Sequence, residues 1–104
     1  MSSTKEYLEF ILEQLSKIND IKFRAMMGEY IIYYRNKIIG GIYDDRFLIK
    51  QTKSAKKLMP DAPLELPYEG AKEMLLVEDI ENKEFLKELF DSMVDELPTT
   101  KKNK

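Results

Sequence analysis

Apolar residues recur at steps of three and four positions in two segments, one near each end of the chain. This spacing gathers apolar side chains on one face of an α-helix, so it predicts two amphipathic helices. Ser3 followed by Glu6 has the spacing of a capping box, and Asn82 precedes the second stripe, so we expect Ser3 and Asn82 to cap the two helices. The stripes consist of Leu8, Ile11, Leu12, Leu15 and Ile18 in the first segment and of Phe85, Leu86, Leu89, Phe90, Met93 and Leu97 in the second.

Four short segments between these helices have the composition of β-strands. β-Branched and aromatic residues dominate them, and the first also alternates apolar with polar residues. Gly28, Asn36 and Asp45 lie in links so short that consecutive strands must be antiparallel neighbours. We therefore predict a four-stranded meander with strands over residues 21–26, 30–34, 38–43 and 47–50.

A short helix, an extended segment and one more strand complete the predicted order. Thr52 can cap a helix over residues 53–59, which must end before Pro60. The prolines of segment 60–68 favour an extended crossing segment, and residues 74–77 have the composition of a short strand. The order α-β-β-β-β-α-β-α predicts a two-layer α+β domain over residues 1–98, in which the N- and C-terminal helices pack on an antiparallel sheet. Residues 99–104 are expected to form a flexible basic tail.

Both faces of the two central strands are apolar, which is unusual for a sheet covered by helices on one side. If the helices cover the face that carries Ile32, Ile38 and Ile42, the alternate residues point the other way. The second face is then covered by the short helix and segment 60–68, or it is a surface for a partner or a second copy, or it forms a ligand cleft. The candidate partner surface consists of Tyr30, Ile31, Tyr33, Ile39, Gly40, Gly41 and Tyr43.

Gly40 and Gly41 interrupt the third strand, where glycine costs roughly 0.5–1 kcal/mol relative to alanine. A β-bulge that curves the sheet would explain the pair, and so would the close approach of a ligand or of another backbone. The two glycines do not form a nucleotide-binding signature, because no Gly-x-Gly-x-x-Gly spacing accompanies them.

The charges are distributed unevenly along the chain. Residues 21–58 carry nine basic and three acidic residues, whereas residues 60–98 carry twelve acidic and three basic residues. The two halves can attract each other within the fold, or each can face a partner. Lysines gather near the predicted start of the short helix, where free backbone N–H groups can bind an anion. The candidate anion-binding residues are Lys50, Thr52, Lys53 and Lys57, and a solvated basic face is the alternative interpretation.

The composition argues against several classes of function. Histidine and cysteine are both absent, which removes the usual zinc ligands, disulfides and the usual general base at neutral pH. No nucleophile, base and orienting group occur together, so we expect neither an enzyme nor a cofactor. The pI near 5.3 and the lack of a nucleic-acid motif argue against direct nucleic-acid binding. Without a long apolar run or a signal peptide, we expect no membrane insertion and a cytoplasmic location.

Four short runs of the chain form a recognisable pattern: Arg24-Ala25-Met26-Met27-Gly28-Glu29-Tyr30, residues 31–34, Gly40-Gly41 and Asp45-Arg46-Phe47-Leu48-Ile49-Lys50. In this order they resemble the N-terminal domain of the TfoX (Sxy) family. Met27 and Glu29 depart from the pattern, because Phe and Gly are more usual there. The resemblance implies a secretion-chaperone-like α+β fold. The family's competence regulators carry a second, C-terminal domain, so the resemblance implies a stand-alone N-terminal domain protein here.

The sequence and the resemblance together indicate a non-enzymatic regulatory domain that acts by binding a protein through its sheet. The family's role in competence implies a partner in the transcription machinery or a transcription regulator, and a homodimer is a further form that the contact could take. A small-anion or nucleotide-binding domain is the alternative function.

Overall fold

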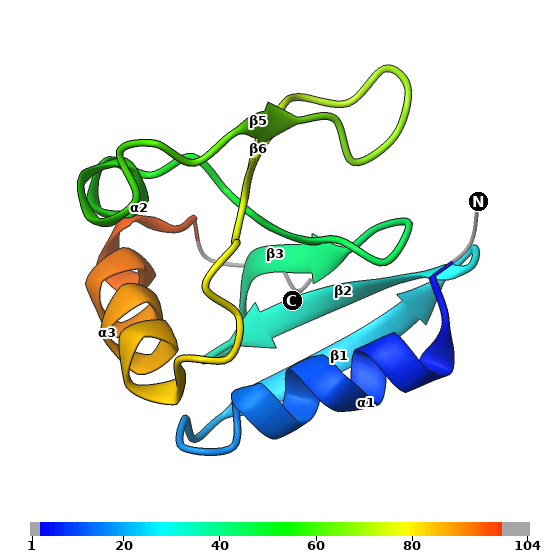
Figure 1. Cartoon of the computed structure of the whole chain (residues 1–104), viewed down its shortest axis with the longest axis horizontal. Helices are drawn as coiled ribbons and strands as arrows, with labels where there is room; N and C mark the ends of the chain where they lie inside the picture. The colour runs from blue at the N-terminus through cyan, green and yellow to red at the C-terminus, as the bar shows by residue number, and fades with distance from the viewer. Residues whose placement is uncertain (1–2, 99–104) are drawn as a thin grey trace.

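The computed structural model describes residues 3–98, and the elements follow the predicted order (Figure 1). The predicted basic tail, residues 99–104, lies outside the described residues. No helix in the described part of the chain is long and apolar enough to cross a membrane. The helices are α1 (Lys5–Gln14), α2 (Lys53–Leu58) and α3 (Lys83–Met93), with a 3-10 turn at Val94–Glu96. The strands are β1 (Ile21–Met26), β2 (Glu29–Tyr34), β3 (Lys37–Ile42), β4 (Phe47–Ile49), β5 (Leu64–Glu65) and β6 (Met74–Leu76).

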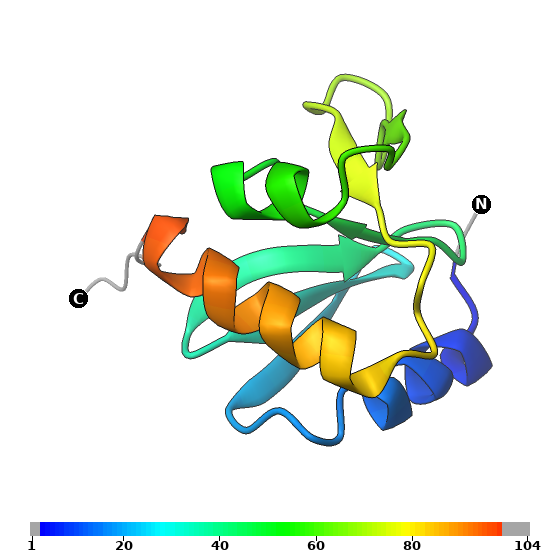
Figure 2. The same ribbon diagram turned by 60° about the vertical axis from the view of Figure 1, so that its left-hand side comes forward.

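The strands form one antiparallel sheet in the order β1-β2-β3-β4-β6-β5. Strand β5 is the middle of the segment that we expected to be extended, and it pairs with β6 at the edge of the sheet. Helices α1 and α3 cover one face of the sheet, here called the inner face (Figures 1 and 2). The short helix α2 packs against α3. The α+β architecture predicted from the sequence is therefore confirmed.

Three two-residue turns connect β1 to β4, and both central residues of each turn have positive φ. This left-handed pair of residues matches the twist of the flanking strands, as in type I′ hairpins. Asn36 and Asp45 adopt the conformation expected of them, because their short polar side chains tolerate it. The central residues are Met27 and Gly28 (54° and 86°), Arg35 and Asn36 (52° and 65°), and Asp44 and Asp45 (54° and 56°).

Thr4, not Ser3, caps α1, so the predicted capping box is wrong. The Thr4 hydroxyl accepts a hydrogen bond from the Tyr7 N–H at 3.1 Å. Ser3 is used elsewhere: its hydroxyl accepts from the Asp45 N–H at 3.0 Å and donates to Glu29 at 2.8 Å. Ser3 therefore ties the start of the chain to the β3–β4 turn. Asn82 caps α3 as predicted, accepting from the Phe85 N–H at 3.1 Å.

A β-bulge in β3 decides which side chains of this strand enter the core. Gly40 pairs with Ile32, but the next residue of β2 pairs with Ile38, so Ile39 is an extra residue in β3. Ile39 is fully buried in the core, whereas Ile38 lies on the outer face opposite Tyr33. The expectation that Ile38 faces the helices and Ile39 faces away was wrong, because the bulge reverses the alternation between them.

Gly40 lies where the backbone of β4 leaves no room for a side chain. A Cβ atom placed on Gly40 would clash with the Leu48 carbonyl oxygen and lie 2.8 Å from the Ile49 Cα. Backbone atoms cannot yield as a flexible side chain can, so only glycine fits at position 40. Close approach of another backbone therefore explains Gly40, and the bulge lies next to it at Ile39.

We predict that Ile39→Ala lowers the free energy of unfolding by roughly 2–5 kcal/mol, because it leaves a cavity in the core. The matched variant Ile38→Ala removes the same atoms from the outer face, and we expect a loss of about 1 kcal/mol. Urea unfolding of both variants measures the difference. Equal losses, or a larger loss for Ile38→Ala, would contradict the register of the bulge.

Candidate functional site: the outer-face groove

The face of the sheet opposite α1 and α3, here called the outer face, carries an apolar groove of about 580 Å³. Its floor is formed by outward-facing residues of β2 and β3, and its ends by the β1–β2 turn and the loop between β5 and β6 (yellow-green in Figure 1). Pockets that bind small molecules or peptide side chains have volumes of this order. The outer-face groove is lined by Met26, Met27, Glu29, Ile31, Ile38, Tyr43, Lys50 and Tyr68.

Large apolar side chains at the ends of the groove are exposed. Met27 is 97% exposed at the tip of the β1–β2 turn, and Tyr68 is 61% exposed at the opposite end. Two charged residues, Glu29 and Lys50, also line the groove. Lys50 enters no ion pair within the described residues. The groove therefore combines an apolar surface, flexible methionine side chains and one unpaired cation.

Tyr43 lies in the groove because Gly41 has no side chain. A Cβ atom on Gly41 would lie 2.7 Å from Cε2 and 2.8 Å from the hydroxyl oxygen of Tyr43, so the ring crosses directly over the glycine. On its other side, the Tyr43 ring lies 6.1 Å from the ring of Tyr68. Burial raises the pKa of Tyr43 above its usual value, and the nearby Tyr68 and Glu29 raise it further. Tyr43 is thus a neutral, partly buried wall of the groove.

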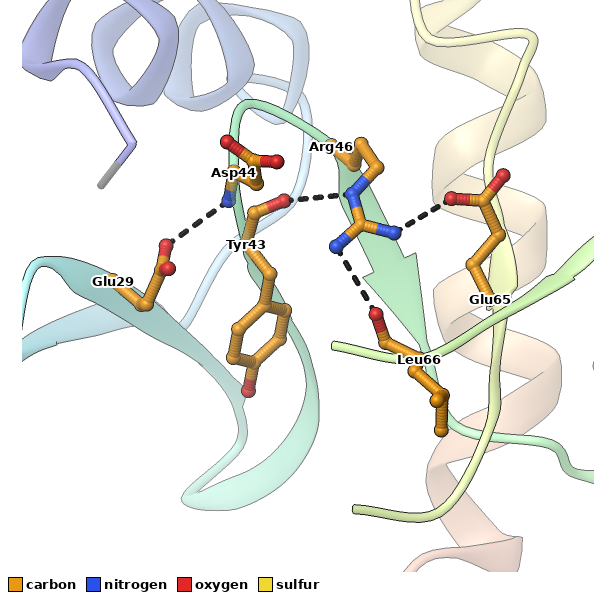
Figure 3. A network of polar contacts seen from close by, with 6 residues as sticks. All are labelled: Glu29, Tyr43, Asp44, Arg46, Glu65 and Leu66. Atoms are coloured by element: carbon orange, nitrogen blue, oxygen red, sulfur yellow. Dashed lines mark hydrogen bonds and ion pairs between the residues drawn. The ribbon is translucent and has the colours of Figure 1, made fainter. Parts of the chain in front are cut away.

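Arg46 fixes the end of the groove near Tyr43 (Figure 3). Its guanidinium donates to the Tyr43 carbonyl at 3.1 Å, to Glu65 Oε1 at 2.6 Å and to the Leu66 carbonyl at 3.1 Å. Glu29 accepts from the Asp44 N–H at 3.1 Å on the other side of the same turn. These contacts join the β3–β4 turn to β2 and to the segment that leads to Tyr68. They hold both walls of the groove in place.

The loop between β5 and β6 covers only part of the outer face. It bounds a second cavity of about 430 Å³, which shares Ile38, Tyr43, Lys50 and Tyr68 with the groove. Leu48, which faces outward opposite Gly41, is completely buried near this end. The interpretation that the proline-containing segment covers the second face is therefore right for the β4 end. The end near β1 and β2 stays open.

The structure separates the predicted partner-surface residues between the two faces. Ile31, Tyr33, Gly41 and Tyr43 belong to the outer face, as expected. Tyr30, Ile39 and Gly40 do not: Tyr30 packs partly against the core, and the other two are buried. Those three assignments were wrong. The error at position 39 comes from the bulge. Gly40 and Tyr30 instead follow the regular alternation of β3 and β2, which turns them inward with Ile42 and Ile32.

Sequence reasoning missed five groove residues: Met26, Met27, Glu29, Ile38 and Tyr68. Two adjacent methionines before the turn glycine were the available signal for Met27, since an apolar residue at a hairpin tip has no core to enter. Tyr68 has no comparable signal. Its position depends on how the distant segment after β5 folds back.

The structure separates the candidate anion-binding residues between the start of α2 and the outer-face groove. Thr52 caps α2 as predicted, accepting from the Ala55 N–H at 3.1 Å. The first turn of α2 already binds a carboxylate of this chain: Ser54 donates its N–H and its hydroxyl to Glu96 at 3.0 and 2.7 Å. Lys50 lies apart from this turn in the groove, and Lys53 and Lys57 are exposed on α2. The carboxylate at the first turn of α2 is therefore Glu96, and Thr52 and Lys53 also help to lower its pKa. Binding of an external anion at this turn stays a prediction.

Within residues 3–98, no group of three or more acidic residues is placed to hold a metal ion. The carboxylates with perturbed pKa serve structure. Hydrogen bonds from the Ser54 backbone and hydroxyl hold the pKa of Glu96 below its usual value. The hydroxyl of Tyr34 donates to Asp91 at 2.6 Å and lowers the pKa of that carboxyl, linking β2 to α3.

Comparison with known proteins identifies a family. The family model described as TfoX N-terminal domain matches residues 13–94, which is most of the chain. An uncharacterized 12.7 kDa protein in the trpE 5' region of Spirochaeta aurantia is 28% identical over 80 residues, covering 77% of this chain and 70% of that protein. No solved structure matches the chain significantly.

We predict that the contact between Glu96 and Ser54 weakens in acid. The folded state binds the Glu96 proton less tightly than the unfolded chain does, so its stabilisation is present above the unfolded pKa, near 4.5. It is lost as the pH falls through the lower, folded pKa. The variant Glu96→Gln should melt below wild type at neutral pH, and the difference in Tm should shrink as the pH falls below 4.5.

Glu88→Gln is the matched control, because Glu88 is exposed on α3 and enters no ion pair among the described residues. Its Tm should follow wild type at every pH. A Tm difference for Glu96→Gln that is independent of pH would contradict the assignment.

Proposed function

Because the chain belongs to the TfoX N-terminal domain family, we propose that it is a non-enzymatic regulatory domain that binds another protein through the outer face of its sheet. The observation that carries this proposal is the outer-face groove. It leaves Met27 and Tyr68 exposed around an apolar floor, and monomeric proteins rarely leave such surfaces without a partner. The partner would cover the open end of the sheet beside β1 and β2.

The composition of the groove fits recognition of a protein. Tyrosine and methionine are enriched at the centres of protein interfaces, and methionine side chains adapt to the partner's shape. The aromatic pair of Tyr43 and Tyr68 provides a rigid wall, because Arg46 holds the strand and the loop from which the two rings project. A rigid wall facing flexible methionines supports binding of an apolar side chain at little entropic cost.

The role that the family has in competence leads us to propose a partner in the transcription machinery or a transcription regulator, in the cytoplasm. A second copy of the chain is the other candidate for the same face. The alternative function, binding of a small anion at α2, lacks support because Glu96 already takes the hydrogen bonds of Ser54.

We predict that the double variant Met27→Asp with Tyr68→Ala loses the natural partner while keeping its fold. Both side chains are exposed, and Asp tolerates the positive φ of position 27, so Tm should change little. Tagged wild type and variant would be used to capture proteins from a lysate of the native host. Nuclease treatment and two salt concentrations remove contacts mediated by nucleic acid or by charge alone, and mass spectrometry identifies what remains.

Leu64→Asp is the control, because Leu64 is 47% exposed but lies outside the groove. Wild type and the control should retain the same partner, and the groove variant should lose it. If all three capture the same proteins, the outer-face groove is not the binding site. Sedimentation of the purified proteins tests whether a second copy of the chain covers the groove. If wild type forms a dimer and the groove variant is a monomer, the partner at the outer face is a second copy and not another protein.

A further inference from the structure

Strand β1 is an open edge of the sheet. It is the terminal strand in the order β1-β2-β3-β4-β6-β5, and residues 22–26 are all exposed. The opposite edge strand, β5, has two residues, whereas β1 has six. Long open edges are templates for pairing with another strand, and most proteins shorten or cover them.

The hydrogen-bond pattern shows which backbone groups of β1 are free. The Arg35 N–H donates to the Asp20 carbonyl at 3.1 Å, just beyond the last pair of the β1–β2 ladder. In an antiparallel ladder, hydrogen-bonded and non-hydrogen-bonded pairs alternate. Lys22 and Arg24 therefore bond to β2, and the N–H and C=O groups of Phe23 and Ala25 point away from the sheet. Among the described residues, no turn, loop or cap hydrogen bond reaches these two residues.

The side chains of β1 give its two faces different chemistry. Lys22 and Arg24 lie on the outer face, opposite Tyr33 and Ile31, and neither forms an ion pair with another described residue. Phe23 lies on the inner face and is 47% exposed. An added strand would meet two cations on one face and an aromatic ring on the other.

This arrangement disfavours pairing of β1 with a second copy of itself. In an antiparallel pair, if Phe23 and Ala25 both bond to outward-facing groups of residues 21–25 of the copy, Lys22 or Arg24 lies opposite a basic residue of the copy. These positions become the non-hydrogen-bonded pairs, in which side chains are closest. Like charges directly opposite each other are destabilising. The charges favour a different strand, one that carries acidic residues.

We propose that β1 accepts an extended segment of a partner protein as a seventh strand, in which acidic residues alternate with apolar residues. The acidic side chains pair with Lys22 and Arg24, and the apolar side chains pack beside Phe23. Backbone hydrogen bonds to Phe23 and Ala25 supply sequence-independent affinity. This inference rests on the proposed function, because the added strand would lie next to the open end of the outer-face groove, and it specifies the chemistry of the partner.

The test uses capped peptides of about seven residues, a common strand length, in which Val alternates with Glu or with Lys. Fluorescence anisotropy would measure binding of each peptide and of a single-stranded oligonucleotide. We expect the Glu peptide alone to bind, more weakly at high salt. The double variant Lys22→Glu with Arg24→Glu should bind the Glu peptide about tenfold more weakly than wild type does, and it should bind the Lys peptide, which wild type does not. Lys53→Glu with Lys57→Glu makes the same change of net charge on α2 and should bind as wild type does.

A proline variant tests the backbone contact separately. Ala25→Pro removes an N–H that points away from the sheet, which edge strands tolerate, and should abolish binding while Tm stays near that of wild type. Equal binding by the charge-reversal variant and its α2 control, or binding of the oligonucleotide in place of the peptide, would overturn the proposal. A further outcome is that the Ala25→Pro variant retains a partner from the lysate that the groove variant loses. That result would refute strand addition at β1 but would still support binding at the outer-face groove.

Discussion

The extra residue in β3 determines which side chains form the outer-face groove and which fill the core. Without the bulge, Ile38 would enter the core and Ile39 would face outward, because side chains alternate strictly along a regular strand. With it, Ile39 fills the core beneath the helices and Ile38 becomes part of the groove floor. Gly40, the next residue in β3, lies against the backbone of β4. One local irregularity thus serves both the core and the outer face.

Polar contacts at one end of the sheet hold this arrangement in place. Ser3, Glu29 and the β3–β4 turn are joined by hydrogen bonds that span up to 42 positions in the chain. Arg46 extends the network to Glu65 and, through the Leu66 carbonyl, to the loop that carries Tyr68 (Figure 3). Because Arg46 and Glu65 are both partly buried, their ion pair is less screened than a surface pair. The groove is therefore a preformed surface, and the ends that carry Met27 and Tyr68 are its exposed parts.

The sequence predicted what local chemistry determines. Helix stripes, caps such as Asn82, and turn residues such as Asn36 and Asp45 are set by neighbours a few positions away. The sequence could not show which residues of β3 face the core. Ile38 and Ile39 are both apolar and of the same size, so either of them could be buried together with Ile42. The contact of Glu96 with Ser54 in the first turn of α2 could not be predicted either, because the two residues are 42 positions apart in the sequence. The bulge explains the errors at Ile38 and Ile39, and Tyr68 could not be found because its position depends on how the segment after β5 folds back.

A partner can bind β1 and the adjacent outer face only if both are open in the free protein. Amide hydrogen exchange, followed residue by residue by NMR, tests this requirement most directly, because each N–H of β1 reports its own hydrogen bond. Lys22 and Arg24 should exchange slowly and Phe23 and Ala25 quickly, and addition of the alternating Glu peptide should slow the latter two. Slow exchange of Phe23 and Ala25 in the free monomer would show that the edge is already covered and would contradict the account.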